Sequence, residues 1–331
     1  MKLKEQITVR GLTLNNRLVM PPMYTGKSTE GGLITDSQLE YYGTRAEGGD
    51  IGLIITEHTF VSQRGKASSG QLSLADDRVI EGLRQLTETI HRDGTKVFAQ
   101  INHAGSAGQE HITGMRNIAP SAVLNPGVKK GFASVIPKEM TKADIAEVVD
   151  QYVLAAGRAL AAGYDGVEIH CAHGYLLNQF YSPITNKRED EYGGSLENRL
   201  RITLEILRAV RSLCGEDRPV AVRLGASDYM EGGNTFEDGA VAAKLLEDAG
   251  CDLLDISGGM IRYTRPGHTE PGYFSESAAA VRNAVSVPVI LTGGVNTAAQ
   301  AETLLQAGFC DMVGVGRAIL ADADWAKKEM R

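Results

Sequence analysis

Short apolar runs alternate with amphipathic stretches along most of the chain. Segments with the 3.6-residue apolar period of a helix lie between most of the apolar runs, at 76–93, 141–163, 195–213, 237–250, 275–285 and 297–307. The apolar runs are rich in β-branched residues and predict eight strands, at 17–22, 51–56, 96–101, 165–170, 219–224, 252–256, 287–291 and 311–315. This alternation predicts an α/β fold, a (β/α)8 TIM barrel with an outer ring of helices.

Longer connections interrupt the alternation. Polar and apolar residues alternate on both sides of a two-residue turn near the start, which predicts a hairpin within residues 1–16. Residues 102–140 follow the third strand and are rich in Gly, Pro, Ser and His, whereas shorter excursions, 171–194 and 257–274, follow the fourth and sixth strands. All three leave the C-terminal ends of strands, so we expect them to cover that mouth of the barrel, with 102–140 as the cover of a substrate.

Composition narrows the class of protein. The 331 residues are 43% hydrophobic, and no linker or low-complexity tract divides them, so we expect a single domain, 1–331. A net charge of −7 without long Lys/Arg blocks argues against a nucleic-acid or membrane partner and favours small molecules as partners. The chain could also form a homo-oligomer. No apolar signal region or span is visible, which indicates a cytoplasmic protein. The cysteines form no Cys-x-x-Cys pair, so neither a zinc ribbon nor an iron–sulfur cluster is expected; they are Cys171, Cys214, Cys251 and Cys310.

The fourth predicted strand ends in a cluster of side chains that carry protons. His170, His173 and Tyr175 follow one another within six residues, next to Gly174. Each alone is typical of an ordinary core or turn residue. Together, at the exit of a barrel strand, they indicate a catalytic site.

Glycine pairs follow the last two strands. Gly293-Gly294 and Gly316-Arg317 lie where barrels commonly bind phosphate, because backbone N–H groups can approach it there and an arginine adds a charged fork. The sequence therefore predicts a phosphate-bearing cofactor. Further candidates at the other strand ends are Pro22, Met23, Tyr24, Thr25, His58, Gln100 and Arg223.

Several of these stretches resemble the old yellow enzyme family of FMN-dependent ene-reductases, and most closely its bacterial branch near the NADPH dehydrogenases and the barrel domain of 2,4-dienoyl-CoA reductases. The resemblance covers nearly the whole chain. It is carried by Asn16 to Arg17, Met20 to Met23, Gln100 to Gly105, His170 to Leu176, Asn186 to Arg199, Val222 to Asp228, Thr292 to Gly294 and Gly314 to Arg317.

The resemblance implies an FMN cofactor reduced by NADPH or NADH. Arg223 is implied to lie near the N1–C2 carbonyl edge of the flavin, where a fixed cation stabilises the reduced anionic ring. The other residues implied to line the cofactor are Pro22, Met23 and Gln100 at the ring and Gly293, Gly294, Gly316 and Arg317 at the phosphate.

The resemblance also implies the reduction of α,β-unsaturated carbonyl compounds. His170 and His173 would donate hydrogen bonds to the substrate carbonyl oxygen, and Tyr175 would be the proton source. This division of roles suits the chemistry, because hydride addition leaves enolate charge on oxygen and the α-carbon then needs a proton.

Three features depart from the pattern of the resemblance. Tyr24 stands where many relatives have a Cys, a Thr or another small residue beside flavin O4, and Thr25 would then take that role. His58 replaces a usually small residue, so it either alters the pocket or turns outward. The sequence ends at Arg331 without the cysteine cluster and second flavin domain of the dienoyl-CoA reductases, which favours direct electron delivery from a nicotinamide to FMN.

Other functions remain open at this point. A flavin-dependent dehydrogenase or demethylase would oxidise a small substrate with the same cofactor. A metal-dependent hydrolase would use His170 and His173 with Glu168 or Asp255, although the glycine pairs would then have no role. A non-catalytic flavin-binding barrel would not need the histidines and the tyrosine.

Overall fold

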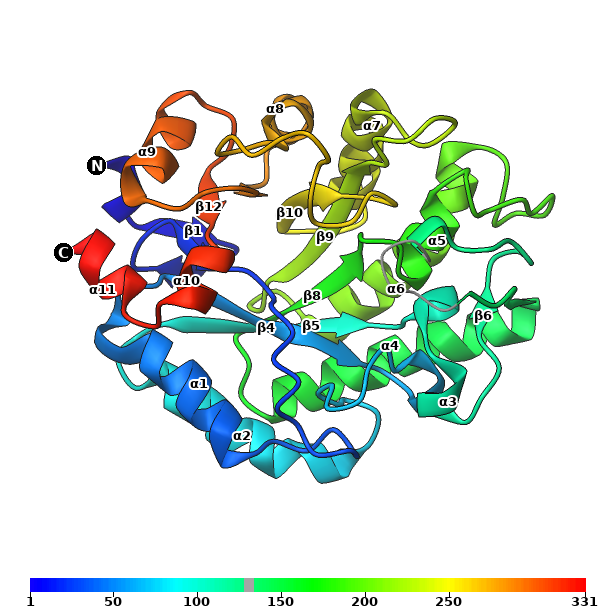
Figure 1. The fold of residues 1–331 in the computed structure, drawn as a ribbon, viewed down its shortest axis with the longest axis horizontal. Coiled ribbons are helices and arrows are strands. Elements are labelled where there is room, and N and C mark those ends of the chain that lie inside the picture. Colours follow the sequence, from blue (N-terminus) through cyan, green and yellow to red (C-terminus); the bar gives the residue numbers. More distant parts are fainter. Residues whose placement is uncertain (128–133) are drawn as a thin grey trace.

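The computed structural model describes residues 1–127 and 134–331. Eight parallel strands close into a barrel, with helices around it (Figure 1). The barrel is closed by β12 and β3, where Val313 pairs with Leu18. In order around the barrel the strands are β3 (Leu18–Met20), β4 (Leu53–Phe60), β5 (Lys96–Asn102), β8 (Gly166–Cys171), β9 (Val220–Ser227), β10 (Leu253–Gly258), β11 (Val289–Thr292) and β12 (Met312–Gly314). The predicted TIM barrel is confirmed.

Six helices follow the predicted segments closely, and the other five were not predicted. The helices are α1 (Asp36–Ala46), α2 (Ile80–His91), α3 (Glu110–Thr113), α4 (Lys142–Ala161), α5 (Leu176–Tyr181), α6 (Leu196–Cys214), α7 (Phe236–Asp248), α8 (Ser275–Ala284), α9 (Ala298–Gln306), α10 (Arg317–Ala321) and α11 (Trp325–Met330). The five that were not predicted are α1, α3, α5, α10 and α11. Helix α1, between β3 and β4, shows no clear apolar period in the sequence, because its buried face includes Gln38 and Arg45. Within the two described ranges, no helix is long and apolar enough to cross a membrane.

The N-terminal hairpin closes one end of the barrel. Strands β1 (Ile7–Val9) and β2 (Leu12–Leu14) pair antiparallel, as predicted. Val9 and Leu14 join an apolar cluster with inward-facing residues of the barrel strands, among them Leu53 and Phe98. The N-terminal end of the barrel is therefore packed with apolar side chains.

Strand alternation brings polar residues into the barrel. Gln100 pairs with Glu168 across β5 and β8, and Arg223 of β9 pairs with both His170 of β8 and Asp255 of β10. Because successive side chains in a strand point to opposite faces, each of these residues faces the barrel interior while its chain neighbours pack against the helices.

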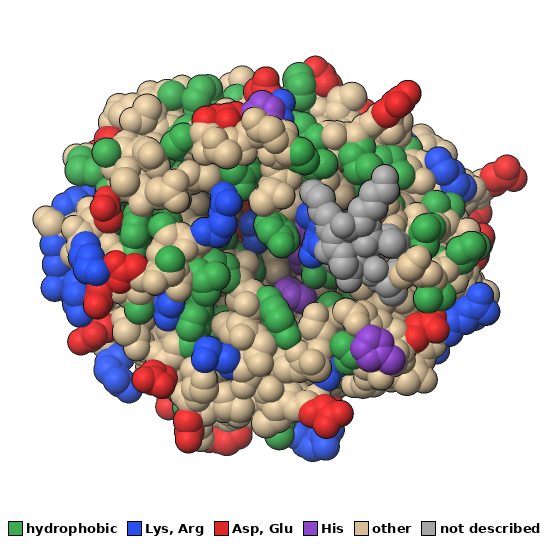
Figure 2. Space-filling model, in the orientation of Figure 1, with side chains coloured by type: hydrophobic (Ala, Val, Ile, Leu, Met, Phe, Trp, Pro, Cys, Tyr) green, Lys and Arg blue, Asp and Glu red, His purple; other side chains and the backbone are tan. Residues whose placement is uncertain are grey.

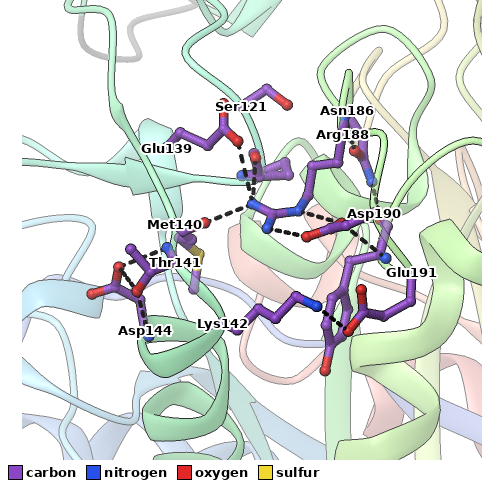
Figure 3. A network of polar contacts seen from close by, with 12 residues as sticks. Ser121, Glu139, Met140, Thr141, Lys142, Asp144, Asn186, Arg188, Asp190 and Glu191 are labelled. Carbon is purple, nitrogen blue, oxygen red and sulfur yellow. Dashed lines mark hydrogen bonds and ion pairs between the residues drawn. The ribbon is translucent and has the colours of Figure 1, made fainter.

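A buried arginine fastens two of the excursions over the C-terminal mouth. Arg188 donates to the carbonyls of Pro120 and Met140, at 3.0 and 2.6 Å, and forms a two-fold contact with the carboxylate of Asp190, at 2.9 and 2.6 Å (Figure 3). The described part of the 102–140 excursion, which includes β6 (Ile118–Ala119) and β7 (Lys138–Glu139), is thereby tied to the excursion after β8. The remainder of that prediction, residues 128–133, lies outside the described residues.

Candidate active site

A cavity of about 440 Å³ opens at the C-terminal end of the barrel. Its mouth is visible as a hollow in Figure 2, with histidine (purple) and basic (blue) side chains at it. All but one of the residues predicted for the site line it: Pro22, Met23, Tyr24, His58, Gln100, His170, His173, Tyr175, Arg223, Gly293, Gly294, Gly316 and Arg317. Strand ends that are far apart in the sequence are thus brought to one place, as the barrel topology requires.

Thr25 is the candidate that the structure does not place in this lining. Its hydroxyl donates to Glu57 Oε1 at 2.7 Å, and its backbone N–H lies 3.2 Å from Glu57 Oε2. The same carboxylate accepts a hydrogen bond from Gln38 of α1, at 3.0 Å. Thr25 therefore helps to satisfy a buried carboxylate beside the cavity.

The two histidines and the tyrosine of the predicted motif form one cluster. The ring centroids of His170 and His173 are 5.0 Å apart and nearly perpendicular, and the rings of His170 and Tyr175 are 5.3 Å apart. His173 Nε2 lies 2.7 Å from Ser257 Oγ at the end of β10. His170 Nδ1 is buried and has no hydrogen-bond partner among the described residues. Both histidines line the cavity, so their rings can meet a ligand there.

The backbone after β8 is shaped to hold this cluster. His173 and Gly174 both adopt left-handed conformations, with φ of 62° and 77°. The Gly174 N–H donates to Asn178 Oδ1 at 2.7 Å, and Asn178 is fully buried on α5. A left-handed histidine is unusual and costs about 1 kcal/mol or more, so the surrounding contacts have to stabilise it, as is common at functional sites.

Burial keeps these titratable groups uncharged. Desolvation, with the nearby Arg223 charge as the second cause, lowers the pKa of His170 and of His173 well below the ordinary value. Desolvation raises the pKa of Tyr175, so its phenol stays protonated at neutral pH. The cluster therefore offers neutral imidazole N–H donors and a proton-bearing phenol.

His58 and Tyr24 occupy the outer part of the same wall. The His58 ring stacks on Tyr175 with centroids 5.4 Å apart, and Gln71 Nε2 donates to His58 Nδ1 at 2.9 Å. Burial, followed by the charge of Arg262, lowers the pKa of His58 to about 4. Of the two outcomes expected for His58, the structure shows the one in which it shapes the pocket. Tyr24 is 44% exposed and donates its hydroxyl to the Ser69 carbonyl, which places it at the rim.

A buried polar layer lies beneath the cavity. Gln100 Nε2 donates to Glu168 Oε1 at 2.8 Å, and Arg223 Nε lies 3.2 Å from Asp255 Oδ2. Thr292 donates to Asp255 at 3.3 Å. Desolvation raises the pKa of both carboxyl groups. The charge of Asp255 raises the pKa of Glu168 further, whereas the charge of Arg223 lowers the pKa of both groups. One arginine thus faces two buried carboxyl groups, which indicates that one of them keeps its proton.

The lining residues fit FMN. Arg317, after the Gly316 turn, lines the cavity together with the Gly293-Gly294 turn, where a phosphate dianion would meet a guanidinium and glycine backbone. Arg223 donates no side-chain hydrogen bond to any described residue, so its N–H groups remain for a ligand. Pro22, Met23 and Gln100 complete a part-apolar wall of the kind that a planar ring needs.

The cavity also has lining residues that no sequence motif indicated. They lie in loops, apart from Leu320 on α10, and they are Ser68, Arg262, Tyr263, Tyr273, Val295 and Leu320. Loop residues of this kind carry no periodic pattern, so only the folded chain reveals them. Across residues 1–127 and 134–331, no three His, Cys, Asp or Glu side chains are grouped as a set of metal ligands.

The chain is similar in sequence and in structure to several known proteins. The family of NADH:flavin oxidoreductases and NADH oxidases matches residues 2–330. The NADH oxidase of Thermoanaerobacter brockii is 41% identical over 97% of the chain and 49% of its own length, so the chain spans about half of that relative. The NADPH dehydrogenase of Geobacillus sp. (strain WCH70) is 40% identical over 98% of the chain and 93% of its length. The solved structure of an old yellow enzyme homologue from Zymomonas mobilis is 31% identical, with a TM-score of 0.87 over 99% of this chain and 92% of that chain.

Proposed function

The chain belongs to the NADH:flavin oxidoreductase / NADH oxidase family, and on that premise we propose that its barrel reduces the activated C=C bond of α,β-unsaturated carbonyl compounds. The family is one of FMN-dependent NAD(P)H oxidoreductases of the old yellow enzyme type, so the predicted family, FMN cofactor and nicotinamide donor are confirmed. The choice of substrate class rests on one observation, the convergence of His170, His173 and Tyr175 on one wall of the cavity.

The two histidines are suited to bind a carbonyl oxygen. Both rings are buried and neutral, and their near-perpendicular arrangement lets N–H groups from two directions meet at one acceptor. Such donors gain strength as negative charge develops on the oxygen, because the surrounding protein has a lower dielectric constant than water and needs no reorganisation. They would therefore stabilise the enolate more than the ground-state carbonyl.

Tyr175 is suited to give the α-carbon its proton. Its phenol is protonated at neutral pH and lies in ring contact with both His58 and His170. Bound FMN would supply the hydride that it has taken from NAD(P)H. The substrate thus gains one hydride and one proton across the C=C bond, and Tyr175 regains its proton from solvent.

Measuring the two half-reactions separately tests this proposal. The purified protein is reduced anaerobically with NADH or with NADPH, and the reduced flavin is then mixed with 2-cyclohexenone or, as a control, with cyclohexanone. We expect rapid reoxidation by the enone alone. Reduced flavin that is not reoxidised by any enone would reject the proposal, and flavin reduction by a small saturated substrate in place of a nicotinamide would favour a dehydrogenase.

A further inference from the structure

We propose that His58 is a third hydrogen-bond donor of the site, which binds the second carbonyl oxygen of substrates whose C=C bond lies between two carbonyl groups. This inference rests on the proposed function, because it concerns the same cavity and the same reaction. It goes further by assigning a specificity-determining residue and by narrowing the class of substrate.

The first observation is a β-bulge that carries His58. The register of β4 against β5 shifts by one residue between Thr56 and Thr59. Two residues of β4, Glu57 and His58, therefore stand opposite one residue of β5, Gln100. Bulges of this kind often lie next to active sites, where they change the direction of a side chain.

The bulge exchanges an acid for an imidazole in the wall of the cavity. Strict alternation from Ile55, which faces the barrel interior, would point the Glu57 side chain inward as well. Instead the Glu57 carboxylate accepts a hydrogen bond from Gln38 of the outer helix α1, at 3.0 Å, and His58 lines the cavity. The backbone of β4 is thus shaped to present the histidine to a ligand.

The second observation is the amide of Gln71, which decides where His58 carries its proton. Gln71 Oε1 accepts the Ala67 N–H at 2.7 Å, and Gln71 Nε2 donates to the His58 carbonyl at 3.0 Å, so both ends of the amide are fixed. The same Nε2 lies 2.9 Å from His58 Nδ1. Because an amide NH2 group can only donate, His58 Nδ1 is the acceptor and carries no proton.

The other ring nitrogen, His58 Nε2, is therefore the donor. Burial, followed by the charge of Arg262, lowers the pKa of His58 to about 4, so the ring is neutral at neutral pH and its one proton is on Nε2. Gln71 and Asn102, both fully buried, cover the Nδ1 edge of the ring. Nε2 has no hydrogen-bond partner within residues 1–127 and 134–331, and it is not shut off from the cavity that His58 lines.

The third observation is the place of His58 relative to the other donors. The ring centroids of His170 and Tyr175 are 5.3 Å apart, and those of Tyr175 and His58 are 5.4 Å apart. Among the described residues, His58 is in ring contact with Tyr175 and Tyr24 and with neither His170 nor His173. With the carbonyl oxygen at the two histidines and the α-carbon at Tyr175, a second acceptor beyond the C=C bond comes opposite His58.

A carbonyl oxygen is the acceptor that suits this donor. A neutral N–H offers no charge to balance a carboxylate, whereas a carbonyl enters the cavity without the cost of removing an ion from water. Hydride addition places the enolate charge on the oxygen at the two histidines, not on the second carbonyl. The His58 hydrogen bond is therefore equally strong before and during the reaction, and it should act on KM rather than on kcat.

Steady-state kinetics test this division. We expect His58→Phe, which keeps a flat ring, to raise KM for 2-cyclohexene-1,4-dione by about 3- to 10-fold, the scale of one neutral hydrogen bond, with kcat nearly unchanged. KM for 2-cyclohexenone, which lacks the second carbonyl, should change by less than about 2-fold. The control is His91→Phe, on the outer helix α2 and outside the cavity lining, and it should change neither KM.

The tautomer is measured directly by long-range ¹H–¹⁵N NMR of the histidine-labelled holoprotein. The signals that His58→Phe removes should be those of a neutral ring protonated on Nε2. A proton on Nδ1, or a charged ring at neutral pH, would overturn the inference.

Ligand binding separates the inference from the proposed function. FMN-loaded protein is titrated by calorimetry with 4-methoxyphenol and 4-ethylphenol, which have nearly the same shape and differ by an oxygen in place of a CH2 group. We expect the wild type to favour 4-methoxyphenol by about 3-fold and His58→Phe to lose this preference. A wild type that binds 4-ethylphenol as tightly or more tightly would overturn the inference even if His58→Phe did not fold.

The combined outcomes distinguish the two failures. If both enones are reduced but His58→Phe changes the two KM values equally, or lowers kcat alone, the inference fails and the function stands. If neither enone is reduced, the function fails, while the titration still decides whether His58 is a donor to ligands.

Discussion

Two buried arginines, Arg188 and Arg223, are used in opposite ways. The Arg188 guanidinium binds the Pro120 and Met140 carbonyls and both oxygens of Asp190. Arg223 has only the ion pair with Asp255, and its side chain donates no hydrogen bond within the described parts of the chain. A buried donor without an acceptor costs about 1–3 kcal/mol, so the Arg223 site gives up stability that the Arg188 site retains.

The two arginines differ in how many of their hydrogen-bond partners the protein itself supplies. Around Arg188 the protein supplies every partner, and the result is two excursions held together over the barrel mouth. Around Arg223 the protein supplies an ion pair with Asp255, a second carboxyl group at Glu168, and a cavity that leaves room for a ligand. Substitutions in the first region should change stability, and substitutions in the second should change binding and chemistry.

The largest effect is expected from Arg188→Met. The variant leaves Asp190 and two carbonyls without their donor, and breaking a buried ion pair costs about 3–5 kcal/mol. Urea unfolding should show this loss of stability. The control Arg208→Met, at an exposed position on α6, should stay within about 0.5 kcal/mol of the wild type. A loss no larger than that of the control would mean that the Arg188 network does not hold the excursions.

The next effect is expected from His170→Ala, in the rate of chemistry. Removing a donor to a developing oxyanion slows a reaction by about 100-fold or more, so enone-driven reoxidation of the reduced flavin should slow by that factor. Tyr175→Phe should slow the same half-reaction and leave flavin reduction by the nicotinamide nearly intact. Stopped-flow absorbance separates the two. Impaired flavin reduction with normal enone reduction in Tyr175→Phe would remove that residue as the proton donor.

A smaller effect is expected from Arg317→Ala, in cofactor affinity. The guanidinium is exposed apart from a 3.2 Å hydrogen bond to Tyr273, so its removal should not disturb the barrel. Losing a charged contact to a phosphate costs about 1.5–3 kcal/mol, which weakens FMN binding by about 10- to 100-fold. Fluorescence titration of the apoprotein measures this. Unchanged affinity would identify Arg317 as an ordinary surface arginine.

At low pH, Glu168→Gln should change the stability of the folded protein less than any of the other variants changes its own property. Burial, followed by repulsion from Asp255, raises the pKa of Glu168 from 4.5 to about 8, so an amide mimics its protonated form. The folded protein then holds this proton more tightly than the unfolded chain. Wild-type stability relative to the variant should be fully present below about pH 4.5 and fall as the pH rises to about 8. A difference that stays constant over this range would mean that Glu168 is ionised.

The sequence predicted the barrel because its signals are periodic. β-Branched runs and amphipathic helices mark strands and helices independently of their partners, and motif residues such as His170 and Gly293 sit at strand ends that the topology then brings together. Helix α1 was missed because Gln38 and Arg45 interrupt its buried face.

The residues that give the cavity its particular shape were harder to predict. Whether His58 enters the cavity depends on its stacking against Tyr175, and whether Thr25 does so depends on the position of Glu57. Arg262 lies in a left-handed turn, and no periodic pattern in the sequence predicts such a turn. Each depends on contacts between loops that only the folded chain brings together.

Thermal unfolding of the apoprotein with and without FMN tests the contrast between the two arginines most directly. A ligand that binds only the folded state raises Tm in proportion to its binding free energy, and each variant serves as its own reference. We predict that FMN raises Tm by the same increment in the wild type and in Arg188→Met, although the latter starts from a lower Tm. In Arg223→Met the increment should be much smaller. An undiminished increment in Arg223→Met, or no increment in the wild type, would contradict the account.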